Sequence, residues 1–338
     1  MARRYTPKPG FRFPGPVPRE ALAYFRAKKF QIGFSYEDVW REEHAVAFTV
    51  AKAMELDVLR DIRDAVDQAL TEGRTLRDFA RDLKPALVQR GWWGRQEMTD
   101  PVTGEVRDVQ LGSPRRLRTI YNANLRTARA AGQWERIQRT RTALPYLLYE
   151  LGPSEVHRPE HAALAGLLLL VDDPFWSTHF PPNGWGCKCW VRQVSRPEAE
   201  TIERSGVQLP GAQEEDPETG LPTGRLVRRK IPVRREAPQI ATREWVNRRT
   251  GEVQRVPVGI DPGWDYNPGQ VGRAVAAGRL YAEKAVAATA DIRIASASSL
   301  PPEVLSVLLP GQSELVARVA MGEPEAVEEM LAILLRLG

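Results

Sequence analysis

The sequence predicts a mainly α-helical protein that contains a small α+β module stabilised by a bound metal ion. An extended arm at residues 1–18 precedes the folded part. Three observations support this fold class. Apolar residues recur near the helical period over long stretches of the chain. Both cysteines and three of the four histidines fall between His157 and Cys189. Residues 1–18 hold five prolines and few large apolar side chains, which predicts an arm that becomes ordered only against a partner.

The composition is that of a soluble globular protein. Of the 338 residues, 42% are hydrophobic and 27% are charged. No apolar run approaches the ~20 residues that a bilayer crossing needs, and the first residues lack the apolar core of a signal peptide. Two cysteines provide no disulfide framework. The composition therefore argues against membrane-spanning and disulfide-rich secreted proteins, and it predicts synthesis in a reducing cytoplasm.

A helical domain is predicted over residues 19–142. Within it, Gly73 predicts a helix stop and Thr75 the N-cap of a restart. Asp100–Gly104 has the composition of a tight turn between two strands. The expected elements, in chain order, are helices over residues 19–29 and 36–90, a hairpin or loop over 92–112 and one long helix over 114–141.

The rest of the chain is predicted to hold the α+β module, a linker and a last helical part. Pro159 suits the first turn of a short helix that ends near Gly166. The module covers residues 143–205, with strands over 143–151, 167–171 and 190–194 and a helix over 197–205. A Pro-, Gly- and charge-rich linker is expected over residues 206–238. Residues 239–338 are expected to form a hairpin over 245–258, a helix over 267–288 and one or two more helices after 301.

The cysteine and histidine cluster predicts a structural zinc site. Thiolate and imidazole groups are both ligands of transition metals, and zinc is the ion that such groups most commonly bind. Cys187 and Cys189 present both sulfur atoms on one face of an extended segment, His161 lies on the short helix beside it, and His179 is the expected fourth ligand. Four protein ligands would close the site. The alternatives are a buried thiol pair beside surface histidines, or a disulfide, which would be strained at this spacing.

The same window resembles the phage Mu F-like minor head proteins, also called head morphogenesis proteins. The resemblance is carried by Arg158-Pro-Glu-His161, Asp173-Pro-Phe-Trp176, Pro181-Pro-Asn-Gly-Trp185 and Cys187-Lys-Cys189. Less specific similarity lies in residues 47–51, 121–128 and 256–269, so that the resemblance covers roughly residues 16–269. Related members place a Cys-x2-Cys pair where this chain has Arg158 and His161. The resemblance therefore supports His161 as a metal ligand and does not support His157.

The arginines are the second feature with a functional implication. The chain has 40 arginines against 8 lysines, and residues 114–141 hold eight arginines against one acid, Glu135. Like charges one helical turn apart repel, which predicts that this face contacts phosphate or acidic capsid surfaces. The predicted contact residues are Arg115, Arg118, Arg126, Arg129 and Arg136. The alternative is that the helix packs on acidic groups of its own chain, such as those between Glu37 and Asp82. A GC-rich genome would also favour arginine.

The resemblance implies a non-enzymatic minor capsid protein that acts inside the procapsid near the portal, in head assembly and in genome packaging or ejection. Its expected partners are the portal and the major capsid or scaffold proteins, with possible sequence-independent DNA contact. Its expected location is the interior of the virion head, and the host cytoplasm during assembly. The alternative function is a metal-dependent nuclease or hydrolase of a phage or mobile element, which an open position on the metal would favour. The chain has no Gly-x4-Gly-Lys-Ser/Thr loop for ATP.

Overall fold

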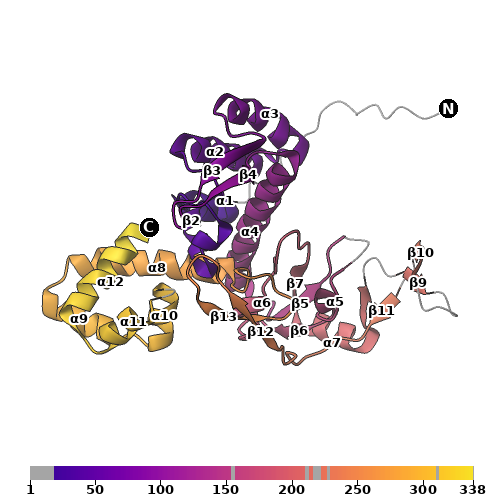
Figure 1. Cartoon of the computed structure of the whole chain (residues 1–338). Helices are drawn as coiled ribbons and strands as arrows, with labels where there is room; N and C mark the ends of the chain where they lie inside the picture. Colours follow the sequence, from indigo (N-terminus) through magenta and orange to yellow (C-terminus); the bar gives the residue numbers. More distant parts are fainter. Residues whose placement is uncertain are drawn as a thin grey trace.

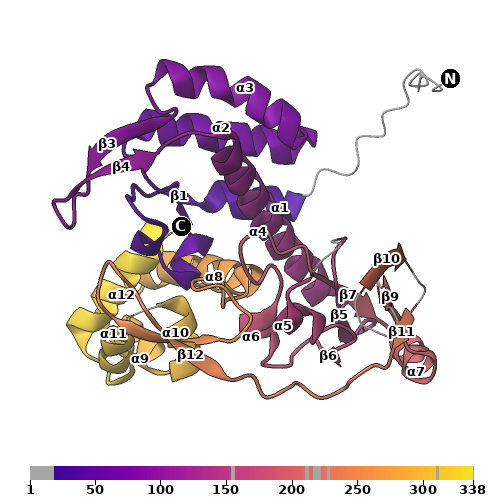
Figure 2. The ribbon, with the colours of Figure 1, turned by 45° about the vertical axis from the view of Figure 1, so that its right-hand side comes forward.

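The structure is a computed structural model that describes residues 19–153, 157–209, 213–215, 222–226, 229–309 and 312–337. The expected arm at residues 1–18 lies outside the described residues. Helices make up nearly half of the chain and the sheets are small. Figures 1 and 2 show three lobes that meet near the long helix α4 (Pro114–Thr140). In the described part of the chain, no helix has both the length and the apolar character that a membrane crossing requires.

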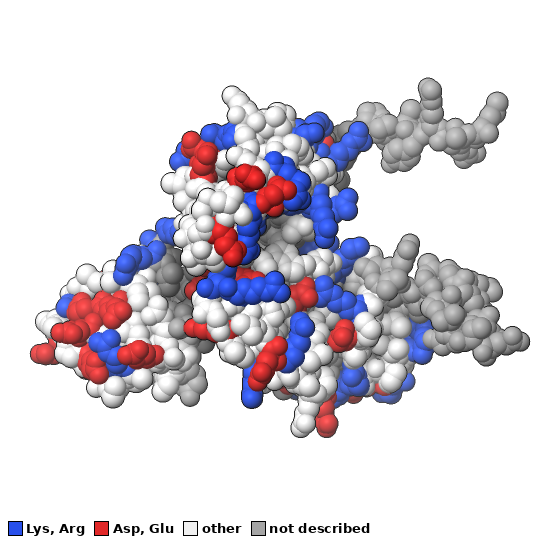
Figure 3. All heavy atoms as spheres, viewed as in Figure 1, with Lys and Arg blue, Asp and Glu red and all other residues white. Residues whose placement is uncertain are grey.

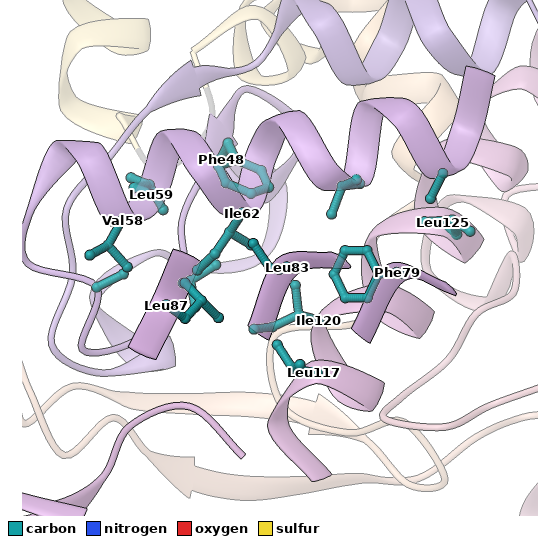
Figure 4. Packing of buried hydrophobic residues seen from close by; sticks show 14 of the residues in the cluster. Phe48, Val58, Leu59, Ile62, Phe79, Leu83, Leu87, Leu117, Ile120 and Leu125 are labelled. Carbon is teal, nitrogen blue, oxygen red and sulfur yellow. The ribbon is translucent and has the colours of Figure 1, made fainter. Parts of the chain in front are cut away.

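The upper lobe in Figure 1 is helical and matches the prediction over most of its length. Gly73 ends one helix in the left-handed region (φ 68°), and the Thr75 hydroxyl accepts the backbone N–H of Asp78 to start the next. Figure 4 shows the core of this lobe, where Phe48, Ile62, Phe79 and Leu117 interdigitate. Its elements are α1 (Arg19–Ala27), α2 (Leu56–Glu72), α3 (Leu76–Gln89), the hairpin β3 (Arg95–Thr99) and β4 (Val106–Gln110), and the first half of α4.

The prediction of a continuous helix from residue 36 is wrong, because residues 36–55 form short turns and a strand. The strands β1 (Lys29–Phe30) and β2 (Ala47–Phe48) pair in parallel, and two 3₁₀ turns lie between them, Tyr36–Asp38 and Arg41–Ala45. The Asp38 carboxylate accepts the backbone N–H groups of Phe34 and Ser35. These contacts cap the start of the first turn, and Val39, which is extended (φ −126°, ψ 124°), ends it after three residues.

The lower-right lobe in Figure 1 is the α+β module. Its three-stranded antiparallel sheet has the order β6-β5-β7, and the central strand is fully buried at Leu147 and Leu148. Trp134 and Ile137 from the second half of α4 pack into the same core as Trp176. The elements are β5 (Tyr146–Glu150), α5 (Pro159–Ala162), β6 (Leu168–Leu170), α6 (Trp176–His179), β7 (Trp190–Val194) and α7 (Arg196–Ser205). The predicted strands and the two predicted short helices of this module are confirmed.

The prediction of a linker over residues 206–238 is wrong where the structure describes that segment. β8 (Val207–Leu209) pairs with β11 (Arg229–Ile231), and β9 (Gln213–Glu215) pairs with β10 (Pro222–Leu226). Leu209 and Ile231 pack against the core of the module. These few apolar side chains are enough to attach the segment, although its overall composition is that of a loop.

The lower-left lobe in Figure 1 is formed by the C-terminal helices. The predicted hairpin is confirmed as β12 (Thr242–Val246) and β13 (Val253–Pro257), and it leads into α8 (Pro268–Val286), which Asn267 caps. Four further helices follow among the residues that the structure describes, where one or two were expected: α9 (Ala290–Ser298), α10 (Pro302–Leu308), α11 (Ser313–Ala320) and α12 (Pro324–Leu337). Pro302 and Pro324 each start a helix, and Gly322 (φ 75°) separates the last two.

Candidate metal centre

His161, Cys187 and Cys189 form a compact cluster of metal-ligating atoms. The Nδ1 atom of His161 lies 3.7 Å from each of the two sulfur atoms, and the three ligand atoms all lie within 4.8 Å of one another. Zinc bonds of about 2.0–2.1 Å to nitrogen and about 2.3 Å to sulfur, at tetrahedral angles, place nitrogen and sulfur about 3.6 Å apart. The observed separation therefore fits a zinc ion between the three side chains.

Local backbone geometry brings these three side chains together. Pro159 starts the short helix α5 and places His161 on its only full turn. Gly186, with a φ of 74°, turns the chain immediately before Cys187. Gly152, after β5, allows the cysteine segment to approach closely, because a Cβ atom there would lie 2.0 Å from the Lys188 carbonyl oxygen. Cys187 is buried and Cys189 is partly buried, so the cluster is shielded from solvent.

The far side of the His161 ring is fixed by a loop that lies about a hundred residues later in the chain. Its Nε2 atom lies 2.8 Å from the Gly259 carbonyl oxygen, which can only accept a hydrogen bond. His161 therefore carries a proton on Nε2, and its Nδ1 atom faces the two cysteines. Metal-bound histidines usually donate their second ring N–H to a carbonyl or carboxylate in this way. This arrangement is an independent sign that the donor set suits a metal.

The electrostatics of the cluster favour one thiolate. The hydrogen bond from Cys187 and further hydrogen bonds from His161 and Tyr149 lower the pKa of Cys189 to about 4, although burial opposes this. The same hydrogen bond between the thiols raises the pKa of Cys187, as does burial. Burial is the largest influence on the pKa of His161 and lowers it, but the hydrogen bonds to Cys189 and Gly259 and the charge of Cys189 together raise it above its usual value. A thiolate beside a buried imidazole is the donor chemistry of a soft cation site.

The predicted fourth ligand, His179, lies outside this group. Its ring stacks on Phe175 with ring centroids 4.3 Å apart, and its Nδ1 atom lies 2.7 Å from the Thr178 hydroxyl. Its Nε2 atom is buried and has no hydrogen-bond partner among the described residues. Burial lowers the pKa of His179 to about 4, so the ring is neutral near pH 7. His179 and His161 line one cavity of about 280 Å³.

The other histidine of the window, His157, also lies outside the cluster. Its Nε2 atom contacts the Gly152 carbonyl oxygen at 2.9 Å. Arg158, at the neighbouring position, forms a two-point ion pair with Asp261, with N–O distances of 2.9 and 3.1 Å. The side chains at 157 and 158 are thus engaged elsewhere, and His161 alone provides the upstream ligand within the described cluster.

Asp261 is a residue of the site that sequence reasoning did not single out. Besides Arg158, it accepts the backbone N–H of Trp185 at 2.7 Å, and its own N–H donates to the Asn183 carbonyl oxygen. It therefore holds the cysteine segment against the loop that contains Gly259. In the sequence, the only indication that Asp261 matters is the less specific resemblance of residues 256–269 to the family. No spacing rule connects that segment to the cysteines.

Three of the five predicted contact arginines line an open groove beside the metal cluster. Arg126, Arg129 and Arg136 face Lys188 and the half-exposed Trp190 across a cavity of about 520 Å³, whose lining contains no acidic residue among those described. Arg126 donates to the carbonyl oxygen atoms of Gly186 and Cys187, so it also supports the cysteine segment.

The alternative for this helix, that it packs on acids of its own chain, holds at one end only. Arg136 and Arg139 share Glu20 of α1, which is not among the acids considered from the sequence. Arg115, Arg118 and Arg129 are exposed and have no side-chain or carbonyl partner within the described ranges. Arg115 and Arg118 lie outside the groove.

Comparison with known proteins identifies relatives of this chain. Residues 60–192 match the model of a family described as phage Mu protein F like protein. Over 258 residues the chain is 40% identical to the putative capsid assembly protein F of Escherichia phage Mu, an alignment that covers 75% of this chain and 54% of that protein. It is 41% identical over 160 residues to the Mu-like prophage FluMu F protein of Haemophilus influenzae, covering 46% of this chain and 37% of that protein. The aligned part thus spans about half or less of each relative. No solved structure matches the chain.

Proposed function

The chain belongs to the phage Mu protein F like family through residues 60–192, and from this premise we propose that it is a minor head protein of a phage or prophage. The proposal rests on its 40% identity to a putative capsid assembly protein. The proposed role is non-enzymatic and lies inside the procapsid near the portal, in head assembly and in packaging or ejection of the genome. The proposed partners are the portal protein and the major capsid or scaffold proteins.

The test is assembly of heads from the same phage or prophage with and without this chain. Procapsids purified after co-expression of the portal, scaffold and major capsid proteins should contain the chain in substoichiometric amounts. Omission of the portal should remove the chain from the particles, whereas omission of DNA packaging should not. Particles that never contain the chain, in the presence of every head protein, would contradict the proposal.

We also propose that the cluster holds one structural zinc ion, with His161, Cys187 and Cys189 as ligands. The observation that supports it is the 3.7 Å spacing of His161 Nδ1 from both sulfur atoms. The ligands join α5 to the segment before β7, and His161 also contacts the loop that contains Gly259, so metal binding would contribute to the folding of the module. Elemental analysis of the freshly purified protein should find about one zinc per chain. Cys189→Ser should remove it, whereas the matched change His157→Ala should not.

His179 is the proposed fourth ligand, because its buried Nε2 atom is without a hydrogen-bond partner and it shares a cavity with His161. His179 lies outside the cluster in the structure, so its side chain would have to move to bind the metal. His179→Ala removes one protein ligand and should therefore weaken zinc binding at least tenfold, as measured by competition with a chromophoric chelator. Unchanged affinity in His179→Ala would mean that the fourth position is held by a group other than this residue.

A metal-dependent hydrolase is the second candidate, and the three-ligand cluster is the observation in its favour, because catalytic zinc keeps one position open for water. Incubation of the zinc-loaded protein with plasmid DNA distinguishes the two functions. We expect no cleavage. Cleavage that disappears in His161→Ala would support the hydrolase and contradict the non-enzymatic role.

A further inference from the structure

A second cavity, about 320 Å³ in volume, forms a groove between α4 and a wall of aromatic side chains. On the α4 side, Thr119, Ala123 and Thr127 lie one turn apart and present small side chains. The opposite wall contains the five aromatic residues Tyr36, Trp40, Trp185, Trp264 and Tyr266. This groove is separate from the metal cluster and from the arginine groove described above.

The aromatic wall is held in place before anything binds. The ring of Trp185 packs edge to face against Trp264, with centroids 4.9 Å apart, and against Tyr36 at 6.0 Å. The backbone N–H of Trp185 is fixed by Asp261. Trp185 nevertheless remains 41% exposed and Tyr36 remains 37% exposed. Grooves lined by rigid, exposed aromatic side chains commonly receive the anchor residues of a partner in protein interfaces.

The charges and polar atoms of the groove indicate what it recognises. Among its lining residues, all of which the structure describes, the charged ones are Lys28, Arg115 and Arg116, and none is acidic. Arg116 is occupied by backbone carbonyl groups, whereas Arg115 is exposed at the rim. The polar atoms Thr49 Oγ1 and Trp40 Nε1 are buried without hydrogen-bond partners. An apolar ligand that also carries anionic hydrogen-bond acceptors would match the exposed Arg115 and the two polar atoms that have no partner.

We infer that this groove binds a peptide segment of another protein, in which an aromatic or aliphatic anchor side chain lies next to carboxylate side chains. The volume is at the lower end of the range for ligand pockets, which suits one or two large side chains. The chain's own arm is a poorer occupant, because Arg3, Arg4, Lys8 and Arg12 would meet positive charge at the rim. The groove is therefore assigned to a partner of opposite charge.

The first experiment uses anilinonaphthalene sulfonate, a fluorescent probe that combines aromatic rings with one anionic group. It should bind the full-length protein saturably at one site. Ala123→Trp should fill the groove and weaken binding at least tenfold, whereas Ala277→Trp, on an exposed part of α8, should leave it unchanged. Arg115→Glu should weaken binding several-fold, and Arg118→Glu, on the same helix but outside the groove, should not. Circular dichroism and thermal unfolding establish that each variant is folded.

The second experiment tests the occupant by displacement of the probe. A synthetic peptide with tryptophan between pairs of glutamates should displace it, and the same peptide with lysines in place of the glutamates should not. Equal displacement by both peptides would overturn the assignment of charge. Stronger displacement by a peptide of residues 1–18 would assign the groove to the chain's own arm. Self-association in sedimentation that Ala123→Trp abolishes would assign it to a second copy. Insensitivity of probe binding to Ala123→Trp would overturn the site itself.

Discussion

Lys28 shows how one buried charge sets the response of the fold to pH. It is 6% exposed, and its Nζ atom donates to the His44 carbonyl oxygen at 2.6 Å. Burial lowers the pKa of Lys28 to about 7, well below that of a lysine in the unfolded chain, about 10.4. Between these two values the unfolded state binds more protons than the folded state. The free energy of unfolding increases with pH wherever the unfolded state binds more protons than the folded state. Folding stability should therefore rise as the pH increases from 7 to 10.

The first prediction is that Lys28→Met reduces this rise and stabilises the protein at pH 7. The expected gain is on the order of 2 kcal/mol, since the change replaces a poorly solvated amine by an apolar side chain of similar length. Urea unfolding at pH 7, 8.5 and 10 measures it. Lys284→Met, at an exposed position of α8, is the control and should leave the pH dependence intact. A wild type whose stability does not increase over this range would contradict the prediction.

At the metal cluster, the stability of the fold depends on the absence of a side chain at Gly259. Its φ of 91° disfavours any side chain, and a Cβ atom would lie 2.6 Å from the Cβ of Glu160. The second prediction is that Gly259→Ala costs about 3 kcal/mol of unfolding free energy, from backbone strain together with displacement of α5. Gly251→Ala is the matched control, because Gly251 has a φ of 77° but open space around it. Chemical denaturation should find the first variant clearly less stable than the second; equal losses would mean that the contact with Glu160 contributes nothing.

At the scale of elements, the sequence predicts what local rules determine and fails where distant contacts decide. The ends of α2 and α3 follow from Gly73 and Thr75, and α4 follows from its long apolar period. Residues 36–55 also show an apolar period, but Asp38 and Glu43 only cap the starts of two short turns, and the extended residue Val39 ends the first of them. The strands β8 and β11 could not be predicted, because they depend on packing against a core formed by other elements.

Arg249 illustrates such a distant contact. It lies in the turn of the β12–β13 hairpin and forms ion pairs with Asp38 and Asp100, which come from two other turns. Its guanidinium lowers the pKa of Asp100 to about 2, so this contribution to stability is present above pH 4 and is lost as the pH falls toward 2. Three turns that are far apart in the sequence are thereby held together by one side chain that is 9% exposed.

The third prediction is that Arg249→Met destabilises the protein by about 3 kcal/mol, because the buried Asp100 and the partly buried Asp38 lose their counter-charge. Thermal unfolding at pH 7 and at pH 3 measures it. The loss should be smaller at pH 3, where the unfolded carboxylates are largely protonated and the ion pairs are worth less. Arg243→Met, on the exposed side of β12, should have little effect at either pH. A loss that is equal at both pH values would show that the ion pairs are not its cause.

Over the whole molecule, charge is distributed unevenly among the lobes. The chain after residue 290 carries seven Asp and Glu against three Lys and Arg, whereas residues 114–141 are almost free of acids. Figure 3 shows Asp and Glu gathered on the lower-left lobe and Lys and Arg along the right-hand side of the upper lobe. Because α4 joins the upper and lower-right lobes, its arginines lie beside the cysteine segment. The sequence of the helix alone does not predict this proximity.

The candidate metal centre could be predicted only in part for the same reason. The clustering of rare soft ligands indicates His161, Cys187 and Cys189, which the structure brings together. The rotamer of His179 depends on its stacking with Phe175, and the hydrogen bond to Gly259 depends on a loop that lies 98 residues from His161. Neither contact has a signature in spacing or composition. Prediction from the sequence therefore reaches the ligands that share one segment and stops at the contacts that tertiary packing determines.

The last prediction concerns the arginine groove, which we expect to contact DNA phosphate or acidic head proteins. Arg129→Glu with Arg136→Glu should weaken binding to a DNA fragment or to the portal protein and should lower the slope of log affinity against log salt by about 2, because two ion contacts are lost. Arg126 is left unchanged, since it supports the cysteine segment and its reversal would confuse folding with binding. Arg118→Glu, outside the groove, is the charge-matched control. Filter binding and sedimentation between 50 and 200 mM salt are the measurements. A wild type without salt-sensitive binding to either partner would mean that these arginines serve only the chain itself.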